Sequence, residues 1–224
     1  MREHVVEQEF LTRVLSWWQG RVCEFPWRKS TDPYKVLVTE LMLVRTKARQ
    51  VAAIWGGFFG RYPDARTLAA ATDEEVQVAL GSLGLRWRAR KIRSLAIELC
   101  DKYGGEEPGH GWDEAEALGP YSRRAARMVI RGFGELPVDW GVARVLARVN
   151  GIDARGEIRR SRRVIEVARE LSPCSRESFW GLVDLARDVC LPNRPRCQEC
   201  PLVSDCRWAA SQRGEKGEVG SVRK

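Results

Sequence analysis

Four cysteines near the C-terminal end constrain the fold of this chain more than any other feature. Cys190, Cys197, Cys200 and Cys206 form the pattern C-x6-C-x2-C-x5-C, with three prolines between them. Thiolates so close in sequence can converge on one metal centre, as both a four-cysteine zinc site and an iron–sulfur cluster require. The spacing leaves both metals open. Local disulfides or separate buried thiols are the alternative, but no other part of the chain is typical of a secreted protein.

The net charge favours a nucleic-acid partner, and an odd number of cysteines, 7, favours a reducing compartment. The chain carries 38 Lys and Arg against 30 Asp and Glu, a net charge of +8. Nucleic-acid-binding proteins share this excess with other basic proteins. The first residues are charged, and no apolar run approaches the roughly 18 residues of a membrane span. We expect a cytoplasmic protein, nucleoid-associated if prokaryotic, without membrane contact. With only 2 histidines, a catalytic group is expected to be a carboxylate.

Apolar residues recur at helical spacing through almost the whole chain. One such stripe is formed by Val142, Val145, Leu146 and Val149. Residues 36–51 are expected to form one long, largely buried helix. Helix starts are indicated at Asp32-Pro33 and at Thr72–Glu75, and the polar residues 211–224 are predicted to be a disordered tail. No alternation of strands and helices is visible, so the sequence predicts an all-α fold.

Two short segments in the middle of the chain carry polar chemistry. The first, Ala117-Leu118-Gly119-Pro120-Tyr121-Ser122, is a glycine hairpin that opens a helix, so its outward N–H groups suit a DNA phosphate. The second is Asp139, which lies further along between an apolar run and an apolar helix. Each has a simpler interpretation, because glycine hairpins join helices in many proteins and Asp139 can simply cap its helix.

Together, the hairpin, the acid and the cysteine loop resemble the helix–hairpin–helix DNA glycosylase superfamily. The resemblance extends from Phe25 to Cys206, and its most specific element is the cysteine spacing, which is similar to that of the endonuclease III and MutY branch. It implies a [4Fe–4S] cluster rather than zinc, with the four cysteines as ligands and Asp139 as the catalytic acid. It also implies two helical domains with an active-site cleft between them: a bundle with the hairpin (30–137) and an iron–sulfur domain (1–29 and 138–210).

Three further positions separate the branches of this family. Glu40 lies where MutY enzymes keep a catalytic glutamate. Arg45 precedes Thr46, and an arginine before this threonine is similar to the pattern of the archaeal Mig-type thymine/uracil mismatch glycosylases. Such an arginine can fill the gap left by an extruded base or bind the guanine that has lost its partner. Tyr121 lies where bifunctional endonuclease III enzymes place a Schiff-base lysine, so a monofunctional enzyme is expected. Simpler roles are a surface acid for Glu40, a phosphate clamp for Arg45 and hairpin packing for Tyr121.

The resemblance therefore implies a base-excision DNA glycosylase, a hydrolase of N-glycosyl bonds that acts in DNA repair on double-stranded DNA with a mismatched base. Thymine or uracil opposite guanine is the favoured target, and a monomer is expected. Two alternatives stay open: adenine opposite guanine or 8-oxoguanine, which Glu40 favours, and a non-catalytic iron–sulfur DNA-binding protein. The expected catalytic residues are Asp139, Tyr121 and Glu40, and the expected DNA contacts are Arg45, Trp87, Arg88, Leu118, Gly119 and Ser122.

One dipeptide and two single positions depart from the family pattern; the dipeptide, Ala115-Glu116, lies where a Leu-Pro pair usually precedes the hairpin. Ala117 replaces the first glycine of the hairpin, and Gly141 replaces the asparagine that commonly follows two residues after the catalytic Asp. The first change is expected to alter the hairpin geometry and the second to loosen the placement of Asp139. Ala117 and Gly141 are also the only support in the sequence for the non-catalytic alternative.

Overall fold

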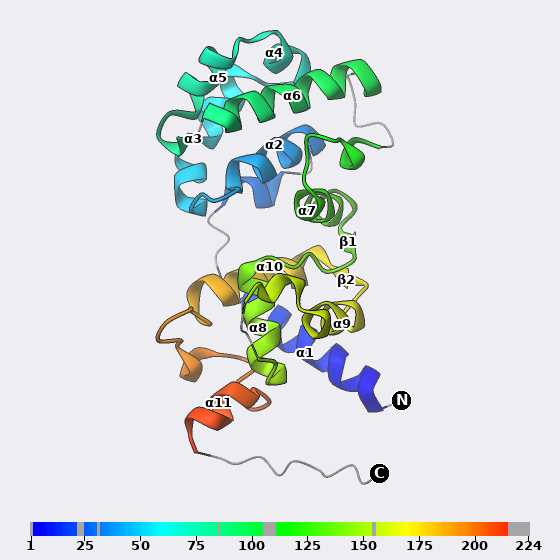
Figure 1. Ribbon diagram of the computed structural model, residues 1–224, viewed down its shortest axis with the longest axis vertical. Helices are drawn as coiled ribbons and strands as arrows, with labels where there is room; N and C mark the ends of the chain where they lie inside the picture. The colour runs from blue at the N-terminus through cyan, green and yellow to red at the C-terminus, as the bar shows by residue number, and fades with distance from the viewer. Residues whose placement is uncertain are drawn as a thin grey trace. The chain divides into compact units, whose positions relative to one another are not determined.

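The computed structural model describes residues 2–21, 25–30, 32–84, 86–104, 111–153 and 156–214 (Figure 1). Helices make up nearly all the regular structure of these residues, which confirms the predicted all-α fold. Two short strands, β1 (Phe133–Gly134) and β2 (Cys174–Ser175), pair antiparallel. The chain divides into two compact units, with bounds that differ slightly from the predicted segments: Cys23–Gly132, and Met1–Val22 together with Phe133–Lys224.

The unit Cys23–Gly132 is a helical bundle around α2. Asp32 caps α2 by accepting a hydrogen bond from the Lys35 N–H at 3.3 Å, and Thr72 and Glu75 form a capping box at α5, which confirms both predicted helix starts. Helix α2 packs against α6 and α7, because it is apolar on most sides. In chain order the elements are η1 (Pro26–Lys29), α2 (Pro33–Leu43), α3 (Ala48–Arg61), α4 (Ala65–Ala70), α5 (Asp73–Leu80), η2 (Gly81–Leu83), α6 (Arg86–Tyr103), η3 (Trp112–Glu114) and α7 (Pro120–Arg131).

The prediction of one long helix over residues 36–51 is wrong, because the structure divides this segment between α2 and α3. Helix α2 ends at Leu43 and α3 begins at Ala48. Arg45, between them, has a φ of 54°, in the left-handed region that residues other than glycine rarely adopt. Between Val44 and Val51 only Ala48 is apolar, so the hydrophobic periodicity of the two helices is interrupted at the break rather than continued across it. The break places Arg45 in a turn.

The unit of Met1–Val22 and Phe133–Lys224 joins the N-terminal helix to the C-terminal part of the chain. Its central helix is α10, which packs against both α1 and α8. A Cβ atom on Gly181 would lie 2.9 Å from Val14 Cγ1, so the glycine permits the close approach of α1. Apart from the strands, the elements are α1 (Arg2–Gln19), α8 (Trp140–Asn150), η4 (Ile158–Arg160), α9 (Arg162–Glu170), α10 (Arg176–Asp188), η5 (Cys197–Glu199) and α11 (Arg207–Gln212).

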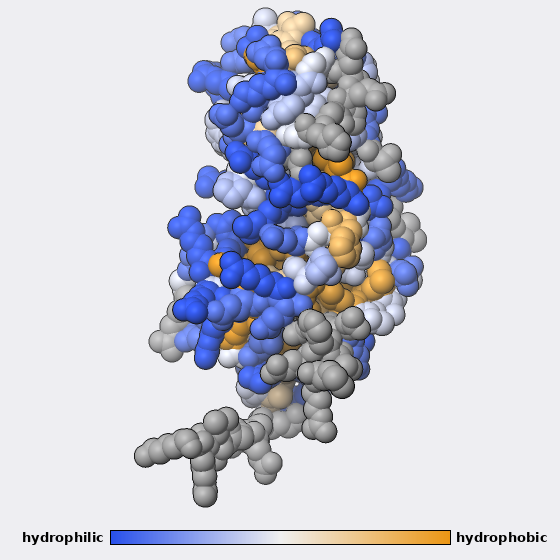
Figure 2. All heavy atoms as spheres, turned by 90° about the vertical axis from the view of Figure 1, so that its right-hand side faces the viewer, coloured by the Kyte–Doolittle hydropathy of each residue, from blue (hydrophilic) through white to orange (hydrophobic). Residues whose placement is uncertain are grey.

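Hydrophilic side chains prevail on the molecular face drawn in Figure 2, and hydrophobic residues show between them in patches. Among the described residues, no helix has both the length and the apolar character needed to cross a membrane. Of the predicted tail, Ser211 and Gln212 belong to α11, and residues 215–224 lie outside the described residues.

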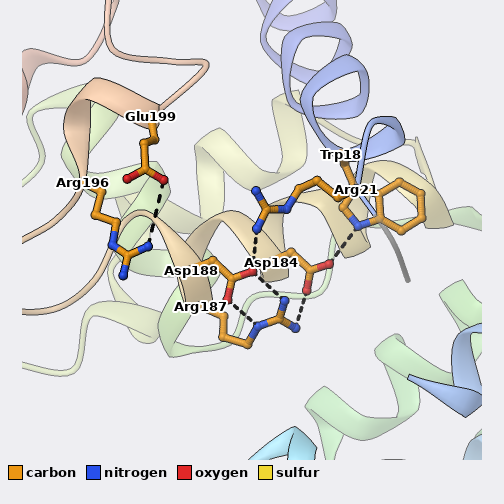
Figure 3. A network of polar contacts seen from close by, with 7 residues as sticks. All are labelled: Trp18, Arg21, Asp184, Arg187, Asp188, Arg196 and Glu199. Carbon is orange, nitrogen blue, oxygen red and sulfur yellow. Dashed lines mark hydrogen bonds and ion pairs between the residues drawn. The ribbon is translucent and has the colours of Figure 1, made fainter. Parts of the chain in front are cut away.

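A polar network fixes α1 to α10 (Figure 3). Trp18 Nε1 donates a hydrogen bond to Oδ2 of the buried Asp184 at 2.8 Å. Arg187 forms ion pairs with Asp184 and Asp188, both at 2.7 Å. Arg21 also pairs with Asp188, at 3.3 Å. The buried carboxylate is thus balanced by a cation, and the N-terminal helix is held to the same unit as Asp139.

Candidate functional site

Asp139 lies at the start of α8 and is the N-cap of that helix. Its Oδ1 accepts a hydrogen bond from the Val142 N–H at 2.6 Å. Burial raises the pKa of the Asp139 carboxyl, and this effect outweighs the backbone N–H groups of Val142 and Gly141 and the charges of Arg144 and Arg159. The capping role that the sequence indicated is therefore real, and it holds in place a carboxylate whose pKa lies above the usual range. Such a group suits proton exchange with a substrate or water.

Trp140 and Arg159 flank this acid, and neither was expected to be a site residue. Trp140 directly follows Asp139, and 50% of it is exposed. The guanidinium carbon of Arg159 lies 4.8 Å from the centroid of the Trp140 ring, and Arg159 forms an ion pair with Glu157. Trp140 could have been identified as a site residue from the sequence, because it is an aromatic residue beside the proposed acid. Arg159 comes from a separate segment and follows no motif.

Gly141 allows α8 to approach α10 closely. A Cβ atom at this position would lie 2.8 Å from the Cβ of Ala186 and 3.3 Å from Asp139 Oδ1. The missing side chain allows α8 and α10 to make close contact beside Asp139. The expectation that Gly141 loosens the placement of Asp139 stays a prediction.

The hairpin before α7 is held from inside by Glu98 of α6. The Glu98 carboxylate accepts hydrogen bonds from the N–H groups of Glu116 at 2.8 Å and Ala117 at 3.1 Å. Arg123 Nε donates to the carbonyls of Ala115 and Leu118 at 3.2 and 3.1 Å. The alanine at position 117 therefore belongs to a turn whose polar groups are satisfied within the protein.

The structure limits how the hairpin residues can meet a ligand. Leu118 and Ser122 are buried as whole residues, with 1% and 5% exposed, so the structure leaves almost none of their surface open to DNA. Gly119 is the N-cap of α7, and a Cβ atom there would meet nothing within 4 Å. A partner can therefore approach the backbone at Gly119.

Glu40, Arg45 and Tyr121 all belong to the unit Cys23–Gly132, whereas Asp139 belongs to the other unit. Glu40 lies on α2 and Tyr121 in the first turn of α7; both are partly buried, and these two helices pack together. Arg45 is exposed in the turn between α2 and α3. The roles of these three residues in catalysis and DNA binding stay predictions.

Arg88 was expected to contact DNA, but the structure buries it completely, with 0% exposed. Its Nη1 donates to the Leu83 carbonyl at 2.6 Å and its Nη2 to the Val44 carbonyl at 2.5 Å. Arg88 therefore positions the turn that carries Arg45 and leaves no surface of its own open to DNA. Its burial results from tertiary packing, which a run of basic residues in the sequence cannot show. The neighbouring Trp87 is 39% exposed and stays available for contact.

The four cysteines predicted as ligands line one pocket, whose empty volume, including the part open to solvent, is about 380 Å³. All four are free thiols, so the alternative of local disulfides is not found. Burial raises the pKa of Cys200 to about 11. Within the described ranges, no group of three or more His, Cys, Asp or Glu side chains is arranged to hold a metal ion. The pocket wall also includes the apolar residues Val145, Leu185, Val189 and Leu202.

Two arginines of α8 connect the helix of Asp139 to the cysteine loop. Arg144 donates to the Cys190 carbonyl at 2.7 Å and to the Ala186 carbonyl at 2.8 Å. Arg148 donates to the Leu191 carbonyl at 2.7 Å, and its Nη1 lies 3.4 Å from Cys190 Sγ. The loop and the acid are therefore parts of one framework, a connection that the sequence did not predict.

Comparisons with known proteins agree with this arrangement. The chain is 32% identical to a thymine-DNA glycosylase of Aeropyrum pernix, over 82% of this chain and 86% of that protein. It is 32% identical to a thymine/uracil-DNA glycosylase of Pyrobaculum aerophilum, over 81% and 83%. It is 30% identical to a human adenine DNA glycosylase, over 94% of this chain but 41% of the human protein. The solved structure of a thermostable thymine-DNA glycosylase superposes with a TM-score of 0.80 at 27% identity, covering 92% and 97% of the two chains.

A family model for HhH-GPD superfamily base excision DNA repair proteins matches residues 38–170, which include the hairpin and Asp139. On this match and on the identity with the archaeal enzymes, the chain belongs to the HhH-GPD superfamily of base excision DNA repair proteins.

Proposed function

We propose that this chain is a monofunctional DNA glycosylase, which hydrolyses the N-glycosidic bond of thymine or uracil mispaired with guanine in double-stranded DNA. Asp139 carries the chemistry: it is a carboxylate fixed at a helix start, with a pKa raised by burial. The likeness to the two archaeal enzymes, which extends over most of each chain, supports the choice of target base.

Asp139 acts in its ionised form. The carboxylate stabilises the positive charge that develops on the sugar as the base leaves. It also orients a water molecule and accepts its proton as the oxygen attacks C1′. Tyr121 takes the place of the Schiff-base lysine of bifunctional relatives, so no amine nucleophile is supplied there. The product is then a free base and an abasic site in an unbroken strand.

The unit Cys23–Gly132 supplies DNA contacts. The accessible backbone at Gly119 and the first turn of α7 bind a phosphate. Arg45, in the turn held by Arg88, enters the space that the flipped nucleotide leaves or binds the opposite guanine. A mismatched base costs less to unstack than a paired one, which favours its selection. The net charge of +8 supports attraction to the duplex.

The same proposal includes a [4Fe–4S] cluster held by the four cysteines. Thiolates around one zinc ion stand about 3.8 Å apart, since Zn–S bonds are about 2.3 Å long. The four thiols share one pocket, and a cluster spreads its four ligands around a larger body than one ion does. Arg148 offers a hydrogen bond to the Cys190 sulfur. When bound, the cluster would cross-link the cysteine loop and add charge at that place.

The cofactor is tested on purified protein by visible absorption and by iron and sulfide content. The proposal predicts iron and sulfide in equal amounts, four of each per chain. Zinc in their place would overturn the cluster assignment and leave the proposal for the reaction intact.

One observation favours a second target, adenine opposite guanine or 8-oxoguanine. Glu40 is partly buried on α2, a helix that packs against α6 and α7, and an acid partly removed from water suits proton transfer to a base. The human adenine DNA glycosylase is also similar to most of this chain. The two targets differ in the base removed, so one assay separates them.

The reaction is tested on labelled duplexes with T:G, U:G, A:G, A:8-oxoguanine or an oxidised pyrimidine, each with and without alkali. The proposal predicts strand breaks at T:G and U:G after alkali only, because the abasic strand stays intact until it is treated. Breaks without alkali would show lyase activity, and cutting at adenine alone would support the second target. Tight DNA binding without any cutting would favour the non-catalytic alternative.

A further inference from the structure

Trp140 is an exposed aromatic residue next to the proposed catalytic acid, and the mechanism above does not use it. It is 50% exposed. Among the described residues of the same unit, the other strongly exposed large apolar side chain is Phe133, at 56%. An indole has a large apolar face that gains from burial against a partner. Its place beside Asp139 makes a nucleic-acid partner the natural choice.

The backbone that carries Trp140 is held rigidly. Asp139 caps α8 through the Val142 N–H at 2.6 Å. Gly141, on the other side, packs so close to α10 that a Cβ atom would lie 2.8 Å from that of Ala186. Trp140 is therefore the first residue of a fixed helix. Ordering its ring in a complex costs little beyond the freedom of two side-chain torsions.

Arg159 supports the indole from one side. Its guanidinium carbon lies 4.8 Å from the ring centroid, a cation–π distance. Arg159 is itself held by an ion pair with Glu157, and its charge lowers the pKa of Asp139. A cation, a half-exposed aromatic ring and an acid thus lie together at the start of α8.

We propose that Trp140, backed by Arg159, is a stacking surface for a nucleobase of the DNA strand on which Asp139 acts. Proteins that hold unstacked nucleic acid combine positive charge with aromatic rings on which bases stack. Every base has a π-face, so this surface selects an unstacked nucleotide over an intact duplex without choosing the base. The inference rests on the proposed function, because it needs a strand with a nucleotide displaced at Asp139.

The test compares binding to two duplexes, one with an uncleavable 2′-fluorothymidine opposite guanine and one fully matched. Fluorescence anisotropy is measured for the wild type and for Trp140→Ala, Trp140→Leu, Trp140→Phe and Phe133→Ala. Stacking on an aromatic side chain predicts that Trp140→Ala and Trp140→Leu bind the mismatched duplex about 10- to 100-fold more weakly. Trp140→Phe keeps most of the affinity, and the matched duplex is bound equally by all variants.

Phe133→Ala is the matched control, since it removes an equally exposed aromatic ring from the same unit. An equal loss in this variant, or equal losses on both duplexes, would overturn the inference. A Leu variant that binds like the wild type would also overturn it, because bulk rather than stacking would then suffice. If the wild type itself does not prefer the mismatched duplex, the proposed function fails; if it does and Trp140→Ala keeps the preference, only the inference fails.

Discussion

One carboxylate, Asp139, caps its helix and is also the group to which we assign the chemistry. The cap hydrogen bonds favour its ionised form, and burial opposes it more strongly, so its pKa is raised. The sequence could place this acid at a helix start, but it could not show the balance of burial and charge, which depends on Arg159 from a distant segment. The same holds for Gly141, whose importance appears only with its neighbour on α10.

The first prediction concerns the pH dependence of excision. Since Asp139 acts ionised and its pKa is raised, the single-turnover rate should fall in acid at a pH above the ordinary Asp value of about 3.9. Arg159→Gln removes a charge that lowers this pKa, so the acid limb should move to higher pH. Arg160→Gln, a neighbouring exposed arginine, should leave it in place. A limb that Arg159→Gln leaves unmoved would contradict this account of the acid.

The second prediction concerns Gly141. Gly141→Ala forces a Cβ atom against Ala186, so the free energy of unfolding should fall by about 1–3 kcal/mol. Ala186→Gly removes the opposing Cβ atom and should restore part of this loss in the double variant. Urea unfolding of the two single variants and the double variant measures the coupling. Purely additive losses would show that the two residues do not contact each other.

At the scale of elements, the hairpin and the turn between α2 and α3 are each positioned by a charged side chain of α6. Glu98 holds the hairpin and Arg88 holds the carbonyl before Arg45. The helix caps could be read from the sequence because they are local. The burial of Arg88 could not, because it depends on packing between segments far apart in the chain.

The third prediction tests the hairpin support. Burial opposes ionisation of Glu98, but the N–H groups of Glu116 and Ala117 and the Lys102 ammonium outweigh it, so its pKa is lowered. Glu98 therefore stabilises the fold above the ordinary Glu pKa of about 4.3, and this stabilisation is lost as the pH falls through the lower folded-state value. The difference in Tm between the wild type and Glu98→Gln should be largest near neutral pH and shrink in acid. A difference independent of pH would contradict the role of the charge.

At the scale of the whole molecule, the family could be predicted because three separate motifs agree: the hairpin, the acid and the cysteine loop. The all-α fold could be predicted because apolar residues recur at helical spacing through almost the whole chain. The motifs could not show that Arg144 and Arg148 join the cysteine loop to the helix of Asp139. Nor could they show that Leu118 and Ser122 are buried. Motifs thus indicated which chemistry the chain carries, and packing decided which side chains can reach a substrate.

The most direct test of the proposed reaction is Asp139→Asn, assayed on the T:G duplex for both excision and binding. Asparagine also caps helices, so the variant should fold and bind the mismatched duplex like the wild type. Its single-turnover excision rate should fall by about 100- to 10,000-fold, because the amide can neither accept a proton from water nor balance the charge on the sugar. Excision at the wild-type rate by the folded variant would contradict the assignment of Asp139 as the catalytic acid.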